Sequence, residues 1–169
     1  MKTIVLPGFS EHNKDWAIEM SKRMNLEHQV IVHEWLHWTR QAQKFSLNYE
    51  LRKIEQEIGK EKINIVAKSV GVYVALNLIP KISSQINKVI LCGIASAANE
   101  DRKNLIETLV SKVPYERILC VQNIHDKYVS FKDAEKFYHL AEPKLKVVSK
   151  PRSDHEYPYP EDFREFLLS

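Results

Sequence analysis

The stretch INIVAKSVGVYVA, residues 63–75, joins two different patterns without a loop between them. Residues 63–67 form a short β-branched and aliphatic run, which is typical of a buried strand. Residues 70–79 are apolar nearly all round, which predicts a helix packed deep against a sheet. A strand is therefore expected to run directly into a helix, with Ser69 at the junction.

The residues around Ser69 follow the pattern small-x-Ser-x-Gly. Small residues at Ala67 and Gly71 allow strand and helix to pass close together at a sharp turn. Such a turn would expose the serine hydroxyl above the sheet, and would bring the Val70 amide and the positive end of the helix near it. The pattern gives Lys68 no catalytic role, and a plain strand-to-helix turn would produce the same spacing.

Apolar runs alternate with amphipathic stretches along the whole chain. The predicted strands are residues 3–6, 29–34, 63–67, 88–92, 117–122 and 145–148. Continuous apolar strands separated by helices indicate a parallel sheet covered on both faces. We therefore expect a three-layer α/β/α sandwich, with a mainly parallel sheet of about six strands, as one domain over residues 1–169.

The composition is that of an ordinary globular protein, with 44% hydrophobic and 28% charged residues. The 25 basic and 22 acidic residues give a net charge of +3 and are scattered, which argues against a nucleic-acid partner. No run reaches the roughly 18 apolar residues of a membrane span, and the N-terminal run is too short for a signal peptide. A cytoplasmic protein without a membrane partner is predicted.

Cys92 and Cys120 lie in apolar runs, as free core thiols do.

Two motifs resemble the α/β-hydrolase superfamily. Residues 67–71 are similar to its nucleophile elbow, G-x-S-x-G, with Ala67 in place of the first glycine. The loop LPGFS, residues 6–10, resembles the loop that supplies the second oxyanion donor, with Pro7 in place of a histidine. The resemblance implies a minimal α/β-hydrolase fold, with an oxyanion hole formed by the amides of Phe9 and Val70.

The remaining polar residues follow the family's order of serine, acid and histidine. Asp126 comes after the strand at 117–122 and precedes a valine by three residues, as in the family's acid loop; Asp154 or Glu156 could replace it. His155 comes after the last predicted strand, where the family places its base. All of these positions follow the carboxyl ends of strands, where open α/β sheets bind their ligands.

The likeness is to small hydrolases without a cap domain, of the retinoblastoma-binding-protein-nine type. In larger relatives a lid follows the fourth strand, whereas residues 95–114 leave room here for one helix. A shallow, open substrate pocket is expected. Its candidate wall residues are Gly8, Ser10, Trp35 and Trp38, although core packing would also account for the two tryptophans.

The resemblance implies a serine esterase that cleaves a small carboxylic ester, or an amide or thioester, through an acyl-enzyme on Ser69. A serine hydroxyl is a poor nucleophile unless an adjacent imidazole removes its proton, and a carboxylate must orient that imidazole. The catalytic triad would be Ser69, Asp126 and His155, and no metal or organic cofactor is needed. A catalytically weak binding or regulatory protein of the same fold is an alternative, which the changes at Ala67 and Pro7 would permit.

A competing motif is HEWLH, residues 33–37, which matches the H-E-x-x-H signature of zinc peptidases. A zinc site would require His33 and His37 on one face of a helix. The preceding Val30-Ile31-Val32 favours a strand instead, and on a strand the two histidines would not share that face. A third ligand would have to come from Glu55, Glu57 or Glu61.

Overall fold

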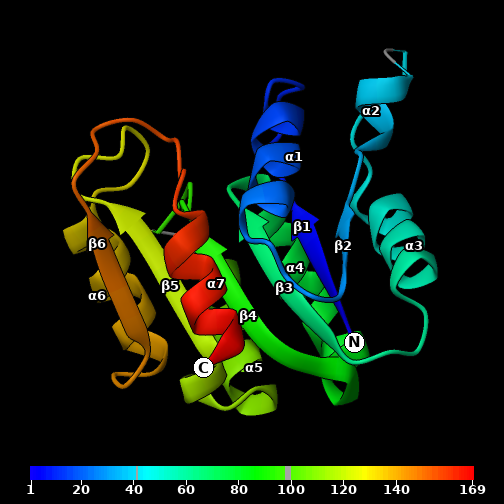
Figure 1. Cartoon of the computed structure of the whole chain (residues 1–169). Coiled ribbons are helices and arrows are strands. Elements are labelled where there is room, and N and C mark those ends of the chain that lie inside the picture. The colour runs from blue at the N-terminus through cyan, green and yellow to red at the C-terminus, as the bar shows by residue number, and fades with distance from the viewer. Residues whose placement is uncertain (41, 98–99) are drawn as a thin grey trace.

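The computed structural model describes residues 1–40, 42–97 and 100–169. Over these described residues, six strands alternate with seven α-helices, and two short 3₁₀ turns precede β4 and β5 (Figure 1). The strands are β1 (Lys2–Leu6), β2 (Gln29–Val32), β3 (Ile63–Lys68), β4 (Ile86–Cys92), β5 (Ile118–Asn123) and β6 (Lys146–Lys150). The helices are α1 (Asn13–Arg23), α2 (Leu36–Thr39), α3 (Leu47–Ile58), α4 (Val70–Ile82), α5 (Glu100–Lys112), α6 (Phe131–Ala141) and α7 (Pro160–Leu168).

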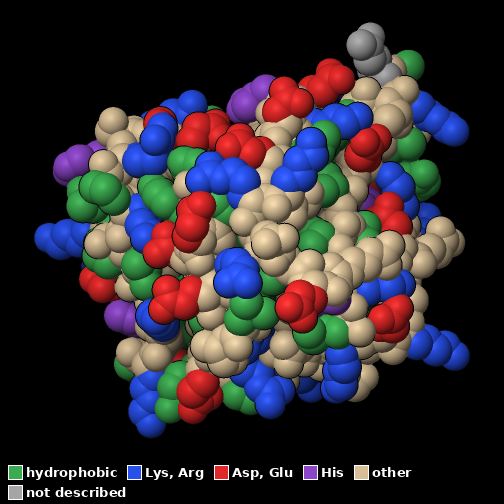
Figure 2. All heavy atoms as spheres, viewed as in Figure 1, with side chains coloured by type: hydrophobic (Ala, Val, Ile, Leu, Met, Phe, Trp, Pro, Cys, Tyr) green, Lys and Arg blue, Asp and Glu red, His purple; other side chains and the backbone are tan. Residues whose placement is uncertain are grey.

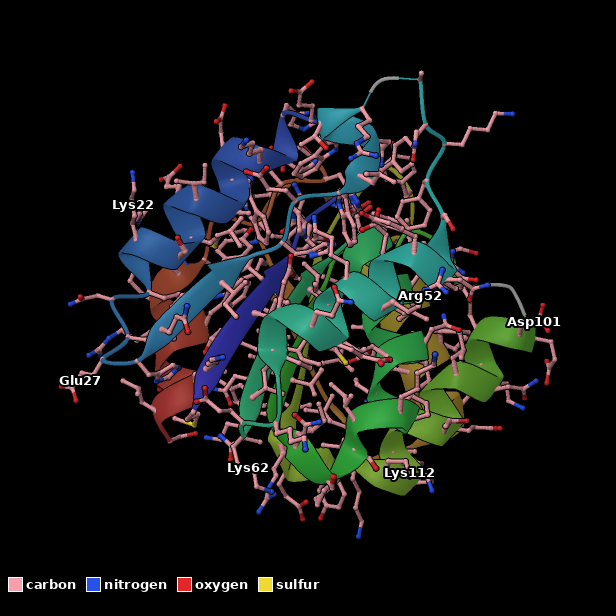
Figure 3. The ribbon with its side chains drawn as sticks, turned by 90° about the vertical axis from the view of Figure 1, so that its right-hand side faces the viewer. Lys22, Glu27, Arg52, Lys62, Asp101 and Lys112 are labelled. Carbon is pink, nitrogen blue, oxygen red and sulfur yellow. The ribbon has the colours of Figure 1, made fainter. Side chains whose placement is uncertain are left out.

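The strands form one sheet in the order β2-β1-β3-β4-β5-β6. Every neighbouring pair is parallel, so all the carboxyl ends lie at the same edge of the sheet. Seen from the β2 side, α1 and α7 lie on one side of the sheet, and α3, α4 and α5 lie on the other (Figure 3). The predicted three-layer fold is confirmed, and the sheet is entirely parallel.

Two cores lie on opposite faces of the sheet, because successive strand side chains point to opposite sides. Val5, Val66 and Ile90 face the core that α1 and α7 cover. Residues next to them in sequence, such as Ile4 and Ile65, face the core that α3, α4, α5 and α6 cover. Both faces of the central strands are thus buried, which explains their continuous apolar sequences.

The observed elements differ from the predicted ones at several ends; for example, β4 begins at Ile86 rather than at residue 88, and β6 ends at Lys150 rather than at residue 148. Strand β2 ends at Val32 rather than at residue 34, and the chain forms the short helix α2 soon afterwards. Helix α4 continues to Ile82, beyond the predicted end at residue 79, and includes Pro80. A proline removes one backbone donor, and here that loss falls in the last turn of the helix.

Basic and acidic side chains are interspersed over the face that carries α1 and α7 (Figure 2). No single-sign surface forms there, in agreement with the scattered charges of the sequence. Among the described residues, no helix is both long and apolar enough to cross a lipid bilayer.

The junction between β3 and α4 brings the first turn of α4 against the end of β1. A Cβ atom added at Gly71 would lie 2.1 Å from the carbonyl oxygen of Leu6 and 2.9 Å from that of Pro7. Real Cβ atoms do not approach so closely, and both obstacles are backbone atoms. Gly71 is therefore required by the contact between helix and strand.

Replacing Gly71 with alanine should lower the free energy of unfolding by about 3 kcal/mol or more, because backbone must move to admit the methyl group. Urea unfolding measures this loss. Gly59→Ala is the control: Gly59 has a φ of 64° and no atom within 4 Å of an added Cβ, so only backbone strain of about 1–3 kcal/mol is expected. Equal losses in the two variants would contradict the close contact.

Candidate active site

Ser69 lies between β3 and α4 in a strained backbone conformation. Its φ of 56° and ψ of −114° are rarely adopted by a non-glycine residue. The Ser69 amide donates to the carbonyl of Cys92 at 3.1 Å, and the Val72 amide donates to the carbonyl of Ser69 at 3.0 Å. These bonds hold the turn at the carboxyl edge of the sheet, as the nucleophile-elbow pattern predicts.

Asp126 and His155 come from different loops and meet at this edge. Asp126 follows β5 and His155 follows β6, and Asp126 Oδ2 lies 2.6 Å from His155 Nδ1. The Tyr157 hydroxyl donates to the same oxygen at 2.6 Å, and the Tyr128 amide donates to Oδ1 at 2.9 Å. The Asp126 carboxylate is fully buried. The alternative acids are partly exposed, and Asp154 binds Arg152 whereas Glu156 binds Lys68.

These contacts define the protonation state of the pair. Burial by itself raises the pKa of Asp126, but the hydrogen bonds from His155, Tyr157 and the Tyr128 amide outweigh it and lower the pKa. An ionised carboxylate only accepts hydrogen bonds, so Nδ1 of His155 carries the proton. Nε2 of His155 is buried and has no hydrogen-bond partner among the described residues. It is therefore free to accept a proton.

The His155 ring lies close to the end of β4, next to the elbow. A Cβ atom at Gly93 would lie 3.0 Å from His155 Cε1 and 2.5 Å from Tyr157 Cε2. Gly93 directly follows Cys92, whose carbonyl accepts from the Ser69 amide at 3.1 Å. Only a glycine at this position leaves room for the imidazole beside the serine turn.

Asn123 holds the loop between β6 and α7 (residues 151–159, the β6–α7 loop) around the histidine. Its Nδ2 donates to the carbonyl of Asp154 at 2.9 Å and to that of Glu156 at 2.7 Å. These two carbonyls belong to the residues on either side of His155. The Tyr159 hydroxyl donates to Asn123 Oδ1 at 2.7 Å, which orients the amide.

The loop between β1 and α1 (residues 7–12, the β1–α1 loop) is anchored by side chains from residues 35–38. Trp35 Nε1 donates to the Gly8 carbonyl at 3.0 Å. Trp38 Nε1 and His37 Nε2 donate to the Phe9 carbonyl, both at 2.8 Å. In a trans peptide the amide points opposite to the preceding carbonyl, so the bond from Trp35 directs the Phe9 N–H away from Trp35.

Trp35 and Trp38 lie in the larger core, where both are buried. As candidate pocket walls they reach the site only through the backbone of the β1–α1 loop. The structure shows that their indole N–H groups bind the backbone of this loop, and their role as pocket walls stays a prediction.

Gly8 is explained by space rather than by a special backbone angle. A Cβ atom there would lie 2.6 Å from Asn13 Oδ1, and the positive-φ glycines of the described chain are Gly59 and Gly93. Ser10, the other candidate in this loop, accepts from Asn13 Nδ2 at 2.9 Å and pairs with His12 Nδ1 at 2.8 Å. Both residues hold the β1–α1 loop against α1.

A cavity of about 570 Å³ lies beside the base, between the loop after β4 and helix α6. The Tyr128 ring, which lines it, packs edge-on against the His155 ring with 4.6 Å between centroids. Ala95 lines the cavity from the β4 side, two residues after Gly93. The remaining lining residues are Ser96, Ala97, Val129, Asp133, Lys136, Phe137 and Leu140.

The structure separates the two histidines of the HEWLH motif. His33 precedes α2 and is fully buried between Glu57, 2.7 Å from Nδ1, and Glu50, 3.0 Å from Nε2. His37 lies within α2 and binds the β1–α1 loop. Because the motif is not one helix, the histidines do not share a face. No group of three His, Cys, Asp or Glu side chains in the described chain is arranged to hold a metal ion.

Several residues of the site carried no sequence signal. Tyr157 and Asn123 act through bonds between loops that are distant in sequence, and neither belongs to a short motif. The two cysteines are free and buried, as predicted. Burial raises the pKa of the Cys92 thiol to about 12, so this cysteine is inert although it adjoins the serine turn.

Solved structures with the same architecture are α/β hydrolases. XC6422 from Xanthomonas campestris, an α/β serine hydrolase without lid, matches with a TM-score of 0.69 and 14% identity, over 99% of this chain and 78% of that chain. Mouse alpha/beta hydrolase domain-containing protein 10 matches with a TM-score of 0.71 and 12% identity, over 99% of this chain and 88% of that chain. Est1E from Butyrivibrio proteoclasticus, bound to ferulic acid, matches with a TM-score of 0.73 and 14% identity, over 99% of this chain and 88% of that chain.

These similarities and the confirmed topology make the fold that of an α/β hydrolase. The model of the family described as serine hydrolase matches residues 3–155. The chain belongs to this family of serine hydrolases. The search of curated proteins found no match to this sequence.

Removing the Tyr157 hydroxyl should destabilise the ionised form of Asp126. In Tyr157→Phe we expect a loss of about 1.5–3 kcal/mol in the free energy of unfolding at pH 7, since a hydrogen bond to a charged group is removed. The pKa of Asp126 is lowered in the folded chain, so this contribution is present above about pH 4 and declines as the pH falls below that value.

Urea unfolding between pH 7 and pH 3 measures the difference between wild type and variant. Tyr159→Phe is the matched control, because its hydroxyl donates to the amide oxygen Asn123 Oδ1 rather than to a carboxylate in the described structure. Its destabilisation should not change over this pH range. A pH-independent difference for Tyr157→Phe would show that the hydroxyl does not favour the ionised carboxylate.

Proposed function

We propose that this serine hydrolase cleaves a small carboxylic ester through an acyl-enzyme on Ser69. The observation that carries the proposal is the pairing of Asp126 with His155 at 2.6 Å, which leaves Nε2 without a hydrogen-bond partner among the described residues, at the same edge of the sheet as the strained Ser69 turn. This arrangement supplies an oriented base at the edge of the sheet that also carries the half-buried serine.

The base and nucleophile act in two half-reactions. The Ser69 oxygen attacks the ester carbonyl while its proton passes to Nε2 of His155. The tetrahedral intermediate then collapses: the bond to the alkoxy oxygen breaks, and the leaving alcohol takes the proton from Nε2. A water molecule repeats the sequence on the acyl-enzyme, giving up a proton to Nε2, and releases the carboxylic acid with Ser69 regenerated.

The oxyanion of each intermediate would be held by the amides of Val70 and Phe9. The Val70 amide opens helix α4, where the helix dipole also favours negative charge. The Phe9 amide is directed by the bond between Trp35 and the Gly8 carbonyl. Two fixed donors stabilise charge that develops only in the transition state, which is how such sites accelerate acyl transfer.

The cavity beside Tyr128 is the proposed acyl site. It contains apolar side chains such as Phe137 and Leu140, and it adjoins the ring of the base through Tyr128. An ester bound there would have its carbonyl near Ser69 and its leaving group toward solvent. Amides and thioesters would follow the same steps, and esters are favoured because an alcohol needs less assistance to leave than an amine.

A fluorophosphonate probe should label wild type, and Ser69→Ala should abolish both labelling and hydrolysis of p-nitrophenyl acetate. His155→Ala should lower the labelling rate by about 10³-fold, because the general base is lost. His125→Ala is the matched control, since this exposed histidine lies one residue before Asp126. Unlabelled wild type, with its fold shown by circular dichroism, would favour a binding protein without turnover.

Filling the cavity should change acyl-chain preference. In Ala95→Leu we expect the KM for p-nitrophenyl octanoate to rise by about tenfold, while acetate hydrolysis stays within about twofold, since the added isobutyl group removes space that only the longer chain needs. Steady-state kinetics over a series of acyl lengths measures this. A parallel change for all lengths would place the acyl group elsewhere.

A further inference from the structure

Lys68 is a buried cation directly before the nucleophile. Only 1% of its surface is exposed. Its ammonium donates to Asn13 Oδ1 at 2.7 Å and to Glu156 Oε2 at 2.6 Å, and it lies 5.1 Å from the centroid of the Trp16 ring. A buried ammonium is costly unless it is paired, and these two hydrogen bonds offset that cost.

The first partner connects Lys68 with the β1–α1 loop. Asn13 is the first residue of α1, and its Nδ2 donates to the Ser10 carbonyl at 3.0 Å and to the Ser10 hydroxyl at 2.9 Å. Its side chain also fills the space against Gly8. The residue between these two contacts is Phe9, the proposed oxyanion donor.

The second partner connects Lys68 with the β6–α7 loop. Glu156 directly follows His155, and its other oxygen lies 3.4 Å from His12 Nε2. Burial by itself raises the pKa of Glu156, but Lys68 and His12 outweigh it and lower the pKa. Glu156 is therefore ionised at neutral pH. Its ion pair with Lys68 fixes the position of the residue that directly follows His155.

A second bond runs between the same elements. Trp16 Nε1, on α1, donates to the Tyr157 carbonyl at 3.0 Å. The start of the chain and its final loop are thus joined on the α1 side of the sheet, with Lys68 between them.

We propose that Lys68 is a positioning residue, whose ammonium holds the β1–α1 loop and the β6–α7 loop in register around Ser69 through Asn13 and Glu156. The inference rests on the proposed function, because it concerns how far the oxyanion donor and the base lie from the serine. Lys68 is given no contact with substrate. Its effect on the reaction passes through the placement of the Phe9 amide and the His155 ring.

This role predicts a particular kinetic signature. Small displacements of catalytic groups slow the chemical step strongly, whereas the substrate cavity near Tyr128 shares no lining residue with the lysine and its partners. Loss of the ammonium should therefore lower kcat and leave KM nearly unchanged. A purely structural lysine would change the stability of the fold and leave the kinetics of the folded protein alone.

The test uses Lys68→Met, which keeps the chain length, and Glu156→Gln, which keeps the shape and removes the charge. We expect Lys68→Met to lower kcat for p-nitrophenyl acetate and the rate of fluorophosphonate labelling by about tenfold or more, with KM within about twofold. Glu156→Gln should show a smaller decrease of the same kind, and should add little in the Lys68→Met background.

Asp162→Asn is the matched control. It removes the charge from the 2.7 Å pair between Lys150 and Asp162, which connects β6 with α7 and touches neither His155 nor the β1–α1 loop. Its kcat, KM and labelling rate should equal those of wild type. Urea unfolding of every variant separates losses of stability from losses of rate.

Wild type that labels at Ser69, together with folded variants that label at the wild-type rate, would overturn the role of Lys68 and leave the proposed function intact. A rise in KM alone would overturn it as well. If Lys68→Met does not fold, Glu156→Gln decides by the same criteria. Folded wild type that fails to label would overturn the proposed function, and this inference with it.

Discussion

The contact between Gly71 and the Leu6 carbonyl is the constraint on which the rest of the site depends. It holds the first turn of α4 against the end of β1, where a Cβ atom would lie 2.1 Å from the carbonyl oxygen. The strained Ser69 turn and the β1–α1 loop are consequently neighbours at one edge of the sheet. In the proposed mechanism, a serine and a candidate oxyanion donor that are about sixty residues apart in sequence can then act on the same carbonyl group, the serine on its carbon and the donor on its oxygen.

Buried polar side chains connect the loops around this edge. Asp126 joins the loops after β5 and β6, Asn123 holds the backbone on both sides of His155, and Lys68 reaches the loops after β1 and β6. Each of these groups would be costly to bury alone, so each is stable only when its partner loop is in place. The cost of burying each group without its partner therefore makes the arrangement of the loops cooperative.

The fold relatives have 11–17% sequence identity, yet they cover 99% of this chain. Such low identity over almost the whole chain shows that the architecture tolerates replacement of most side chains. In this chain, α5 is the only α-helix in the described part of the connection after β4, as expected for a member without a cap. The cavity beside the base is accordingly formed by α6 and the loop after β4 rather than by an added domain.

Local sequence was sufficient where a residue's role depended on its neighbours along the chain. Apolar runs predicted each strand, and the spacing around Ser69 predicted the turn, because strand burial and the Gly71 contact require those residue types at those positions. Local sequence was insufficient to predict where helices and strands begin and end. Strand β2 stops at Val32 because His33 turns into a buried site between Glu50 and Glu57, two glutamates on α3 that no local pattern connects with it.

By itself, the sequence determined the order of strands along the chain, the alternation of strands with helices, and the serine turn. It also determined the acid and histidine positions that the family's order implies. Only the tertiary structure decided which side chains meet: that Asp126 rather than Asp154 binds His155, that Trp35 and Trp38 serve the loop backbone, and that Lys68 lies between two loops. The physical reason is that hydrogen bonds between distant loops depend on where the folded sheet places those loops. Spacing along the chain does not indicate these positions.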